Sequence, residues 1–216
     1  TNNYFLVNSF DYGEYLKKNN NKKNGNYIVF LDSNIENSFE SQVLNNKQTY
    51  FDKKKYWESM EKIFSIFEKK LKRTKIKIAS HFRRSSKDIP INRRFYFDRT
   101  LELVKNSKLV LAHGSLALSW AILFNKPVVL ITNENFDYIS LINNEHIKLV
   151  QKQLSTKLIK VDLQYQFNLD KKFFKNLLKI DISKYEKFKK LHLNFKNNKV
   201  NEISKWNTIS KKLRKI

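Results

Sequence analysis

The chain has 216 residues, enough for one ordinary domain or for one and a half. Its 41% hydrophobic and 14% aromatic residues supply a real core and exclude a chain that is disordered throughout. The absence of cysteine excludes a disulfide framework, a thiolate metal site and a cysteine nucleophile, and the formal net charge of +23 favours anionic partners.

A strand followed by an amphipathic helix opens the regular part of the chain. Residues 1–26 are expected to form an amino-terminal segment, and their polar end, 17–25, reads as an exposed linker. Residues 27–31 are a continuous apolar run, which is typical of a strand buried on both faces. Residues 52–71 carry apolar side chains at steps of three and four, and this spacing predicts a helix with Asp52 as its N-cap.

Further apolar runs alternate with helical segments along the rest of the chain. The predicted strands are residues 76–80, 109–112, 128–131 and 158–161. The predicted helices are residues 100–106, 116–124 and about 136–154. Asp98 or Thr100 is the expected cap of the helix at 100–106, and residues 81–98 are predicted to be irregular. The helix at 116–124 is apolar on nearly every side, so we expect it to be deeply packed.

This alternation predicts an α/β fold. Strands that are continuous apolar runs indicate a Rossmann-like parallel sheet with helices on both faces, and we assign it to residues 27–162. Residues 163–216 are expected to form basic C-terminal helices. No uninterrupted apolar run reaches the roughly 20 residues of a membrane-spanning helix, and no secretory signal begins the chain. We therefore expect a soluble protein.

Polar and basic residues follow the predicted strands. In an open parallel sheet, ligands bind beyond the carboxyl ends of the strands. Asp32, Ser80 and Thr132 stand at three of these ends and are expected to be further ligand contacts. Two more specific motifs follow the predicted strands at 76–80 and 109–112.

The sharper motif of the two is His113-Gly114-Ser115. A glycine at a strand-to-helix turn lets backbone amides approach a ligand closely. Ser115 is expected to cap the following helix, where free amides and the helix dipole favour a phosphate. The alternative is that Ser115 only caps a buried helix and His113 is a core histidine.

The second motif contains His81, Arg83 and Arg84. The planar guanidinium of arginine matches phosphate oxygens in two-point contacts. Arg83 is the preferred phosphate ligand because it lies nearer to the predicted strand than Arg84. The alternative is a basic loop that is merely solvated.

Several other kinds of site are disfavoured. The four histidines are far apart and have no cysteine companions, so no metal site is expected. A Walker-type loop and a G-x-G-x-x-G pattern are absent, which disfavours ATPases and dehydrogenases. A G-x-S-x-G elbow is absent as well, which disfavours a serine hydrolase of the α/β-hydrolase type.

Taken in order, the motifs resemble the nucleotide-binding half of bacterial GT-B glycosyltransferases of surface-polysaccharide synthesis, including sialyltransferase-like and Kdo-transferase-like enzymes. The matching segments are residues 11–12 with 15–16, 27–32, 78–83, 100–107, and 112–117 with 121–128. The resemblance implies a nucleotide-sugar donor, CMP- or UDP-linked, with no separate cofactor and no metal. It implies that His81 and Arg83 stand in one donor-binding motif and Ser115 in the other. Phe82 and Leu116 depart from this pattern, because the family usually has Pro at the first position and often a hydroxyl residue at the second.

The resemblance also implies partners. A complete enzyme of this family has two Rossmann-like domains, whereas this chain has room for one, so we expect a missing or separate amino-terminal half. The acceptor, a glycan or a lipid-linked glycan, and the catalytic base generally belong to that half, and no catalytic residue is assigned here. The lysine-rich helices after Asp170 could also meet an anionic membrane surface. The expected location is cytoplasmic, with or without peripheral attachment at the inner membrane.

Three other functions compete with the transferase. A nucleic-acid-binding module fits the net charge, but the basic residues are spread along the chain and no nucleic-acid fold signature is recognisable. The lysine excess, accompanied by many Asn and Ile residues, also fits an AT-rich coding sequence. A nucleotide-sugar epimerase of related fold and a non-catalytic partner subunit are the remaining alternatives.

Overall fold

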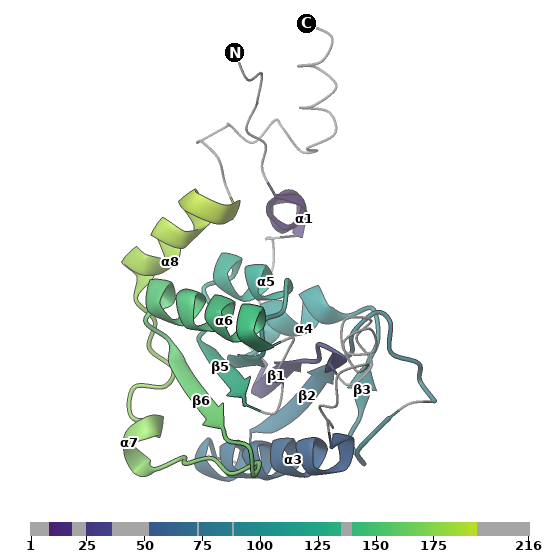
Figure 1. The fold of residues 1–216 in the computed structure, drawn as a ribbon. Helices are drawn as coiled ribbons and strands as arrows, with labels where there is room; N and C mark the ends of the chain where they lie inside the picture. The colour runs from purple at the N-terminus through teal and green to yellow at the C-terminus, as the bar shows by residue number, and fades with distance from the viewer. Residues whose placement is uncertain are drawn as a thin grey trace, which may run out of the picture.

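The structure is a computed structural model that describes residues 9–18, 25–35, 52–72, 74–87, 89–134 and 140–193. Its described strands form one open sheet in the order β3-β2-β1-β4-β5-β6, and every pairing is parallel (Figure 1). These strands are β1 (Tyr27–Leu31), β2 (Lys75–Ala79), β3 (Phe95–Tyr96), β4 (Leu109–Ala112), β5 (Val128–Asn133) and β6 (Lys157–Val161). The predicted Rossmann-like α/β fold is confirmed.

The strand order creates a switch point between β1 and β4. From β1 the chain moves outward to β2 and β3, then returns to the other side of β1 and continues through β4, β5 and β6. The connections that follow β1 and β4 therefore leave in opposite directions, and in open α/β sheets the crevice at such a point receives the ligand. Leu31 of β1 is in register with Ala79 of β2 and with Ala112 of β4, so the three turns that follow begin side by side.

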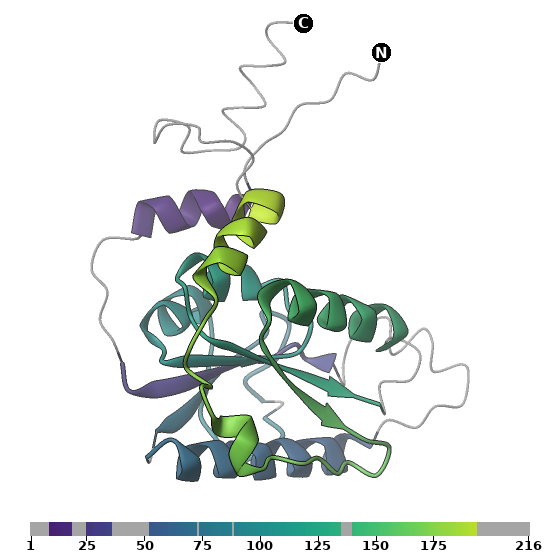
Figure 2. The same ribbon diagram turned by 90° about the vertical axis from the view of Figure 1, so that its left-hand side faces the viewer.

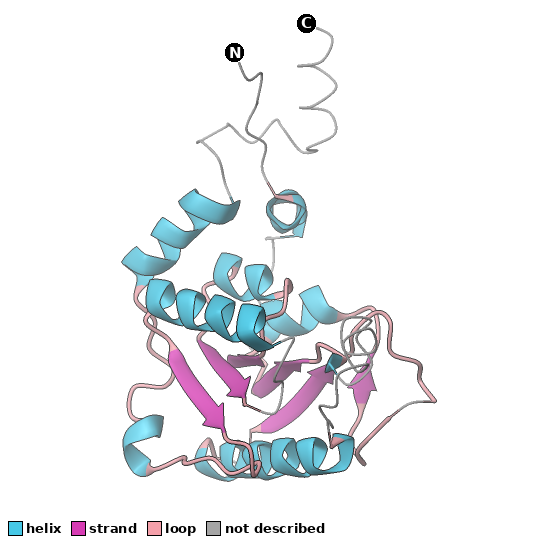
Figure 3. Cartoon of the chain, in the orientation of Figure 1, coloured by secondary structure: helices cyan, strands magenta, loops and turns pink. Residues whose placement is uncertain are grey.

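Successive side chains of β1 enter two separate cores, as the alternation of a strand requires. Ile28 and Phe30 belong to the core shared with α3 (Lys53–Lys70), and Val29 and Leu31 belong to the core on the opposite face. The helices that cover this opposite face are α4 (Thr100–Asn106), α5 (Leu118–Leu123) and α6 (Ser140–Leu154). Figures 1 and 3 show the sheet as a layer between α3 and these three helices. Burial on both faces explains why β1, β4 and the first four residues of β5 are continuous apolar runs, whereas β2 and β6 also contain lysines at less buried positions.

Helix α3 forms as its sequence predicts. The side chain of Asp52 caps the helix by accepting a hydrogen bond from the backbone N–H of Lys55 at 3.0 Å. The stripe at steps of three and four is buried against the sheet, and Phe30 and Phe64 pack with their ring centroids 5.1 Å apart. The buried positions of α3 are Tyr56, Trp57, Ser59, Met60, Ile63, Phe64 and Phe67.

Three local predictions were wrong. Helix α5 begins at Leu118 rather than at residue 116, and its N-cap is Ala117 rather than Ser115. Helix α4 has Arg99 as its N-cap and no side-chain cap, so neither Asp98 nor Thr100 caps it. Strand β3 lies within the segment predicted to be irregular, because two residues are too short to give a periodic signal.

The outer helices pack on the helix layer and on the edge of the sheet. They are α1 (Phe10–Lys18), α7 (Lys171–Phe174) and α8 (Ile182–Phe188), with one π-helical turn, η2 (Lys189–Leu193), after α8. Figure 2 shows α1 and α8 outside the layer of α5 and α6. Tyr165 and Leu177 join the core of α3, while Tyr185 and Leu193 join the opposite core, so the described part of the segment after residue 162 packs against both faces.

The two outermost described residues lie next to each other. The backbone N–H of Ser9 donates a hydrogen bond to the carbonyl oxygen of Leu193 at 3.0 Å. Residues 19–24 of the predicted linker and 194–216 of the predicted basic helices lie outside the described residues. Among the helices of the described part, none has both the length and the apolar character needed to cross a bilayer.

Gly25 stands where the chain enters β1 and permits a close approach. A Cβ atom there would lie 2.4 Å from a ring carbon of Tyr27 and 2.9 Å from the carbonyl oxygen of Asn106. We predict that Gly25→Ala lowers the free energy of unfolding by about 1–3 kcal/mol, measured by denaturant titration. Gly13→Ala, inside α1, is the control and should stabilise the protein by up to about 1 kcal/mol because alanine favours helix. Similar effects of the two substitutions would contradict this explanation.

Candidate functional site

Three of the turns predicted to bind a ligand lie side by side at the carboxyl edge of the sheet. We call residues 32–34, 80–84 and 113–116, which follow β1, β2 and β4, the rim. Because β1 lies between β2 and β4, and neighbouring strands are about 5 Å apart, the two outer turns of the rim begin roughly 10 Å apart. The rim therefore surrounds the switch point of the sheet.

Asp32 holds the turn after β1 against the turn after β2. Its carboxylate accepts two hydrogen bonds from the guanidinium of Arg84, at 2.6 Å from Nε and 3.0 Å from Nη2. It also accepts from the backbone N–H of His81 at 3.2 Å and from that of Asn34 at 2.9 Å. Both partners of the ion pair are buried, with side-chain exposures of 0% for Arg84 and 2% for Asp32. The buried ion pair therefore joins the turn after β1 to the turn after β2.

Aromatic rings fix Arg84 in this position. The central guanidinium carbon lies 5.5 Å from the ring centroid of Trp57 and 5.4 Å from that of Phe95. Such cation–π contacts favour a desolvated arginine over a less delocalised cation. The structure therefore buries two of the predicted ligand residues, Arg84 and Asp32, in the interior of the rim, where they bind each other.

We predict that Arg84→Met lowers the free energy of unfolding by about 3–5 kcal/mol, because it leaves the carboxylate of Asp32 buried without its counter-ion. The double variant Asp32→Asn/Arg84→Met should be less destabilised than Arg84→Met alone, since the uncompensated charge is gone. Denaturant titration of both variants measures the difference. Equal stability of the two variants would show that the buried charge is not the source of the loss.

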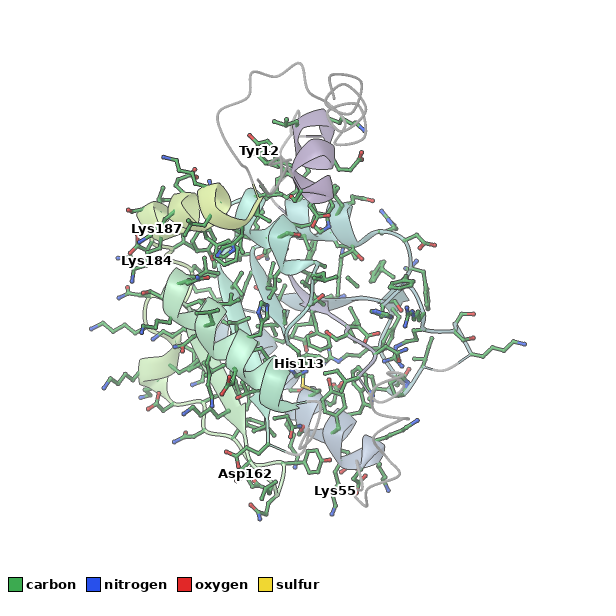
Figure 4. All side chains as sticks on the ribbon, turned by 45° about the horizontal axis from the view of Figure 1, so that its top comes forward. Tyr12, Lys55, His113, Asp162, Lys184 and Lys187 are labelled. Carbon is green, nitrogen blue, oxygen red and sulfur yellow. The ribbon has the colours of Figure 1, made fainter. Side chains whose placement is uncertain are left out.

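His113 points into the core shared with α3. Its Nδ1 lies 2.8 Å from the carbonyl oxygen of Ile131, and its Nε2 lies 3.0 Å from the hydroxyl of Tyr56. A carbonyl only accepts, so Nδ1 carries the proton and Nε2 accepts from Tyr56. The ring of Phe30 meets the imidazole edge-on at 5.8 Å. Figure 4 labels His113 near the centre of the view, away from the molecular outline.

Burial lowers the pKa of His113 to about 4, and the imidazole is therefore neutral at pH 7. The unfolded state takes up a proton near the ordinary pKa of 6.5, whereas the folded state resists it. The contribution of this residue to stability is thus complete above pH 6.5 and declines as the pH falls toward 4.

We predict that stability decreases by up to about 1.4 kcal/mol per pH unit from this residue as the pH falls from 6.5 to 4. His113→Gln, which cannot titrate, should be less stable at pH 7 but should lose less stability over this interval. Denaturant titrations at a series of pH values measure both slopes. Parallel slopes would remove His113 from the acid response.

His81 and Arg83 remain accessible at the rim. The backbone N–H of Arg83 donates to Nδ1 of His81 at 3.2 Å, so the neutral imidazole carries its proton on Nε2. Burial is the largest cause that lowers the pKa of His81, and the nearby Arg83 and Arg84 lower it further, while Asp32 opposes them. The guanidinium of Arg83 is exposed and makes no ion pair with a carboxylate of the described residues. Both side chains thus offer N–H donors at the surface.

The turn after β4 adds neutral donors. The N–H of Ser115 donates to the carbonyl of His113 at 2.9 Å, and the hydroxyl of Ser115 accepts from the N–H of Ala117 at 3.2 Å. The N–H groups of Gly114 and Leu116 make no hydrogen bond within the described part of the chain. Gly114 does not have a positive φ, so an unusual backbone conformation does not account for the glycine. Two amides and a hydroxyl hydrogen flank this turn.

Large apolar side chains are exposed on both accessible turns. Phe82 is 77% exposed and Leu116 is 94% exposed. The ring of Phe82 lies 4.5 Å from that of His81 and 5.2 Å from the guanidinium carbon of Arg83. These two residues stand where the sequence departs from the motifs that it resembles, and the structure exposes both at the rim.

The remaining predicted ligand contacts, Ser80 and Thr132, form hydrogen bonds to backbone carbonyls of neighbouring strands. Ser80 is buried, and its N–H donates to the carbonyl of Tyr96 at 2.9 Å. The hydroxyl of Thr132 donates to the carbonyl of Ile159 at 3.4 Å. Among the described residues, no three His, Asp or Glu side chains gather closely enough to hold a metal ion.

The sequence analysis did not predict the two buried contacts that the rim residues Asp32, Arg84 and His113 make. Asp32 and Arg84 are 52 positions apart, and Tyr56 and His113 are 57 positions apart. No local pattern connects residues at such separations; only the strand order brings them together.

Comparison of the chain with protein-family models, with curated proteins and with solved structures finds no match. The structural basis for a function is therefore the parallel sheet and the accessible donors of its rim.

Proposed function

We propose that the rim binds the phosphate-bearing part of a nucleotide, and that the chain is the donor-nucleotide domain of a glycosyltransferase that moves a sugar from a nucleotide-sugar to a surface-glycan acceptor. The observation that carries the proposal is the position of the accessible donors at the switch point between β1 and β4. Ligands of open α/β sheets bind at this point. The sugar-transfer part rests on the resemblance of the motifs to GT-B enzymes.

The accessible groups suit an anion. Arg83 supplies a guanidinium, neutral His81 supplies an Nε2–H, and the turn at Ser115 supplies a hydroxyl and two backbone amides. Charge-assisted hydrogen bonds from arginine to phosphate are about twice as strong as neutral ones. The buried ion pair of Asp32 and Arg84 holds the turn after β2 in place, and Arg83 in the same turn is left for the ligand.

The proposed reaction is a displacement at the anomeric carbon of the donor sugar, with the nucleotide as leaving group. The bond between the anomeric carbon and the phosphate oxygen breaks, and its electron pair leaves with the phosphate. Arg83, His81 and the amides around Ser115 would stabilise this developing negative charge. An acceptor hydroxyl forms the new bond and loses its proton to a base that we do not assign to this chain.

The apolar residues of the rim favour completion of the site by a second surface. Phe82 and Leu116 are exposed next to the proposed phosphate ligands. A second Rossmann-like half that closes over the rim would cover them and would bring the acceptor. On this proposal the partners are a nucleotide-sugar, a glycan or lipid-linked acceptor, and that second half.

We predict that Arg83→Ala raises the Kd of the cognate nucleotide by about 10- to 100-fold, as expected for a lost charged hydrogen bond. Ser115→Ala should raise it by about 2- to 10-fold, as expected for a neutral one. The nucleotide is first identified by thermal shift with CMP, UDP, GDP and their sugar conjugates, because a ligand of the folded state raises stability. Calorimetric titration then gives Kd for each variant.

Arg94→Ala is the matched control for Arg83→Ala. Both arginines are exposed and lie close to an aromatic ring, since the guanidinium carbon of Arg94 is 4.9 Å from the ring centroid of Tyr96. Arg94 lies outside the rim, so its substitution should change Kd by less than about twofold, the small effect expected of a screened surface charge. Absence of binding by every nucleotide, or equal effects of the two arginine variants, would refute the proposed site.

A further inference from the structure

A cavity of about 570 Å³ lies at the amino-terminal edge of the sheet, the edge opposite the rim. Val128 and Lys157, the first residues of β5 and β6, line it together with the linker between α7 and α8, residues 175–181. Figure 2 shows this linker running from α7 to α8 across the front of the molecule. The volume is that of a site for a small molecule.

Lysines surround this cavity. Four of them line its wall: Lys157, Lys172, Lys175 and Lys179. None of these four forms an ion pair with a carboxylate of the described residues. Four lysines and one aspartate among the lining residues make the local potential positive.

The polar groups among the lysines do not neutralise this charge. Asp181 is the one carboxylate among the lining residues, and its Oδ1 is engaged at 3.2 Å by the backbone N–H of Lys184 as the cap of α8. The ammonium of Lys184 donates to the hydroxyl of Ser155 at the edge of the cavity. In Figure 4, Lys184 and Lys187 on α8 lie well apart from Asp162, which follows the carboxyl end of β6.

The floor of the cavity is apolar. It is formed by buried side chains from β5, from α6 and from the linker, namely Val128, Leu154 and Leu177. Outside the cavity, the same stretch exposes Leu178 at 39% and Ile182 at 51%. A cavity lined by four lysines and by buried apolar side chains is complementary to an anion with an apolar body, because burial of that body adds to the charge attraction.

We propose that this cavity is a second anion site, which binds a phosphate-bearing ligand through Lys157, Lys172, Lys175 and Lys179. The phosphate is carried either by a soluble molecule or by the headgroup of a membrane lipid. The inference does not depend on the proposed function, because the cavity and the rim are at opposite edges of the sheet and are tested with different variants.

The soluble source is tested with inorganic tripolyphosphate and the full chain in an Arg83→Ala/Ser115→Ala background, which removes the rim donors. Calorimetry at physiological salt should detect binding, and adding Lys175→Glu/Lys179→Glu should raise Kd by at least about tenfold. The control Lys53→Glu/Lys54→Glu, on exposed residues at the start of α3 and so at the opposite edge of the sheet, makes the same change in net charge. It should raise Kd by less than about threefold, because salt screens distant surface charges.

The lipid source is tested by co-sedimentation with phosphatidylcholine vesicles that contain or lack phosphatidylglycerol. Binding to the anionic vesicles that is lost in the cavity variant and kept in the control variant identifies a lipid phosphate. Lys157→Met, which removes one cavity charge and keeps an apolar stem, is a second variant for both arms, and thermal unfolding verifies that each variant folds. Selective loss in either arm supports the site, whereas equal loss in both charge variants, or no binding in either arm, overturns it.

Discussion

The buried ion pair between Asp32 and Arg84 is the constraint on which the carboxyl edge of the sheet depends. Two opposite charges are removed from water, and such a pair is tolerated only when each charge is fully compensated. Arg84 is compensated by two oxygens and two aromatic faces, and Asp32 by the guanidinium and two backbone amides. These requirements fix the first turn of the chain after β1 and after β2 in one geometry.

The rim consequently has two layers. The inner layer contains Asp32, Arg84 and His113, whose polar atoms are directed at other parts of the protein. The outer layer contains His81, Arg83 and the turn at Ser115, which are partly or fully exposed. On the proposed function, the bonds of the inner layer would hold the outer donors in place before a ligand arrives, which lowers the ordering cost of binding. The same division explains why two neighbouring arginines, Arg83 and Arg84, have different environments.

The fold was predictable because its strands are unusual. A strand buried on both faces needs an apolar residue at every position, and the runs at residues 27–31 and 128–131 satisfy this requirement without interruption. The cap of α3 was predictable for a similar reason, since Asp52 and its partner are three residues apart. Interactions within a few residues, or repeated along an element, leave a signal in the sequence.

The inner layer of the rim left no such signal. Whether Arg84 faces solvent or Asp32 depends on a turn whose position is set by sheet register, and whether His113 binds a ligand or the core depends on Tyr56, which lies on α3. The predicted cap of α5 was wrong for a local reason. The hydroxyl of Ser115 accepts a hydrogen bond from the N–H of Ala117 and closes a turn before the helix begins. Hydroxyl side chains close such turns as readily as they cap helices.

The hydrogen bond between Ser9 and Leu193 gives the molecule a natural attachment point. Helix α1 packs beside α5, so this point lies on the helical side of the sheet that is remote from α3. Labels placed on Ser9 and on Leu193 would therefore report on one region of the surface, and a surface that captured the protein through that region would leave the face of α3 uncovered.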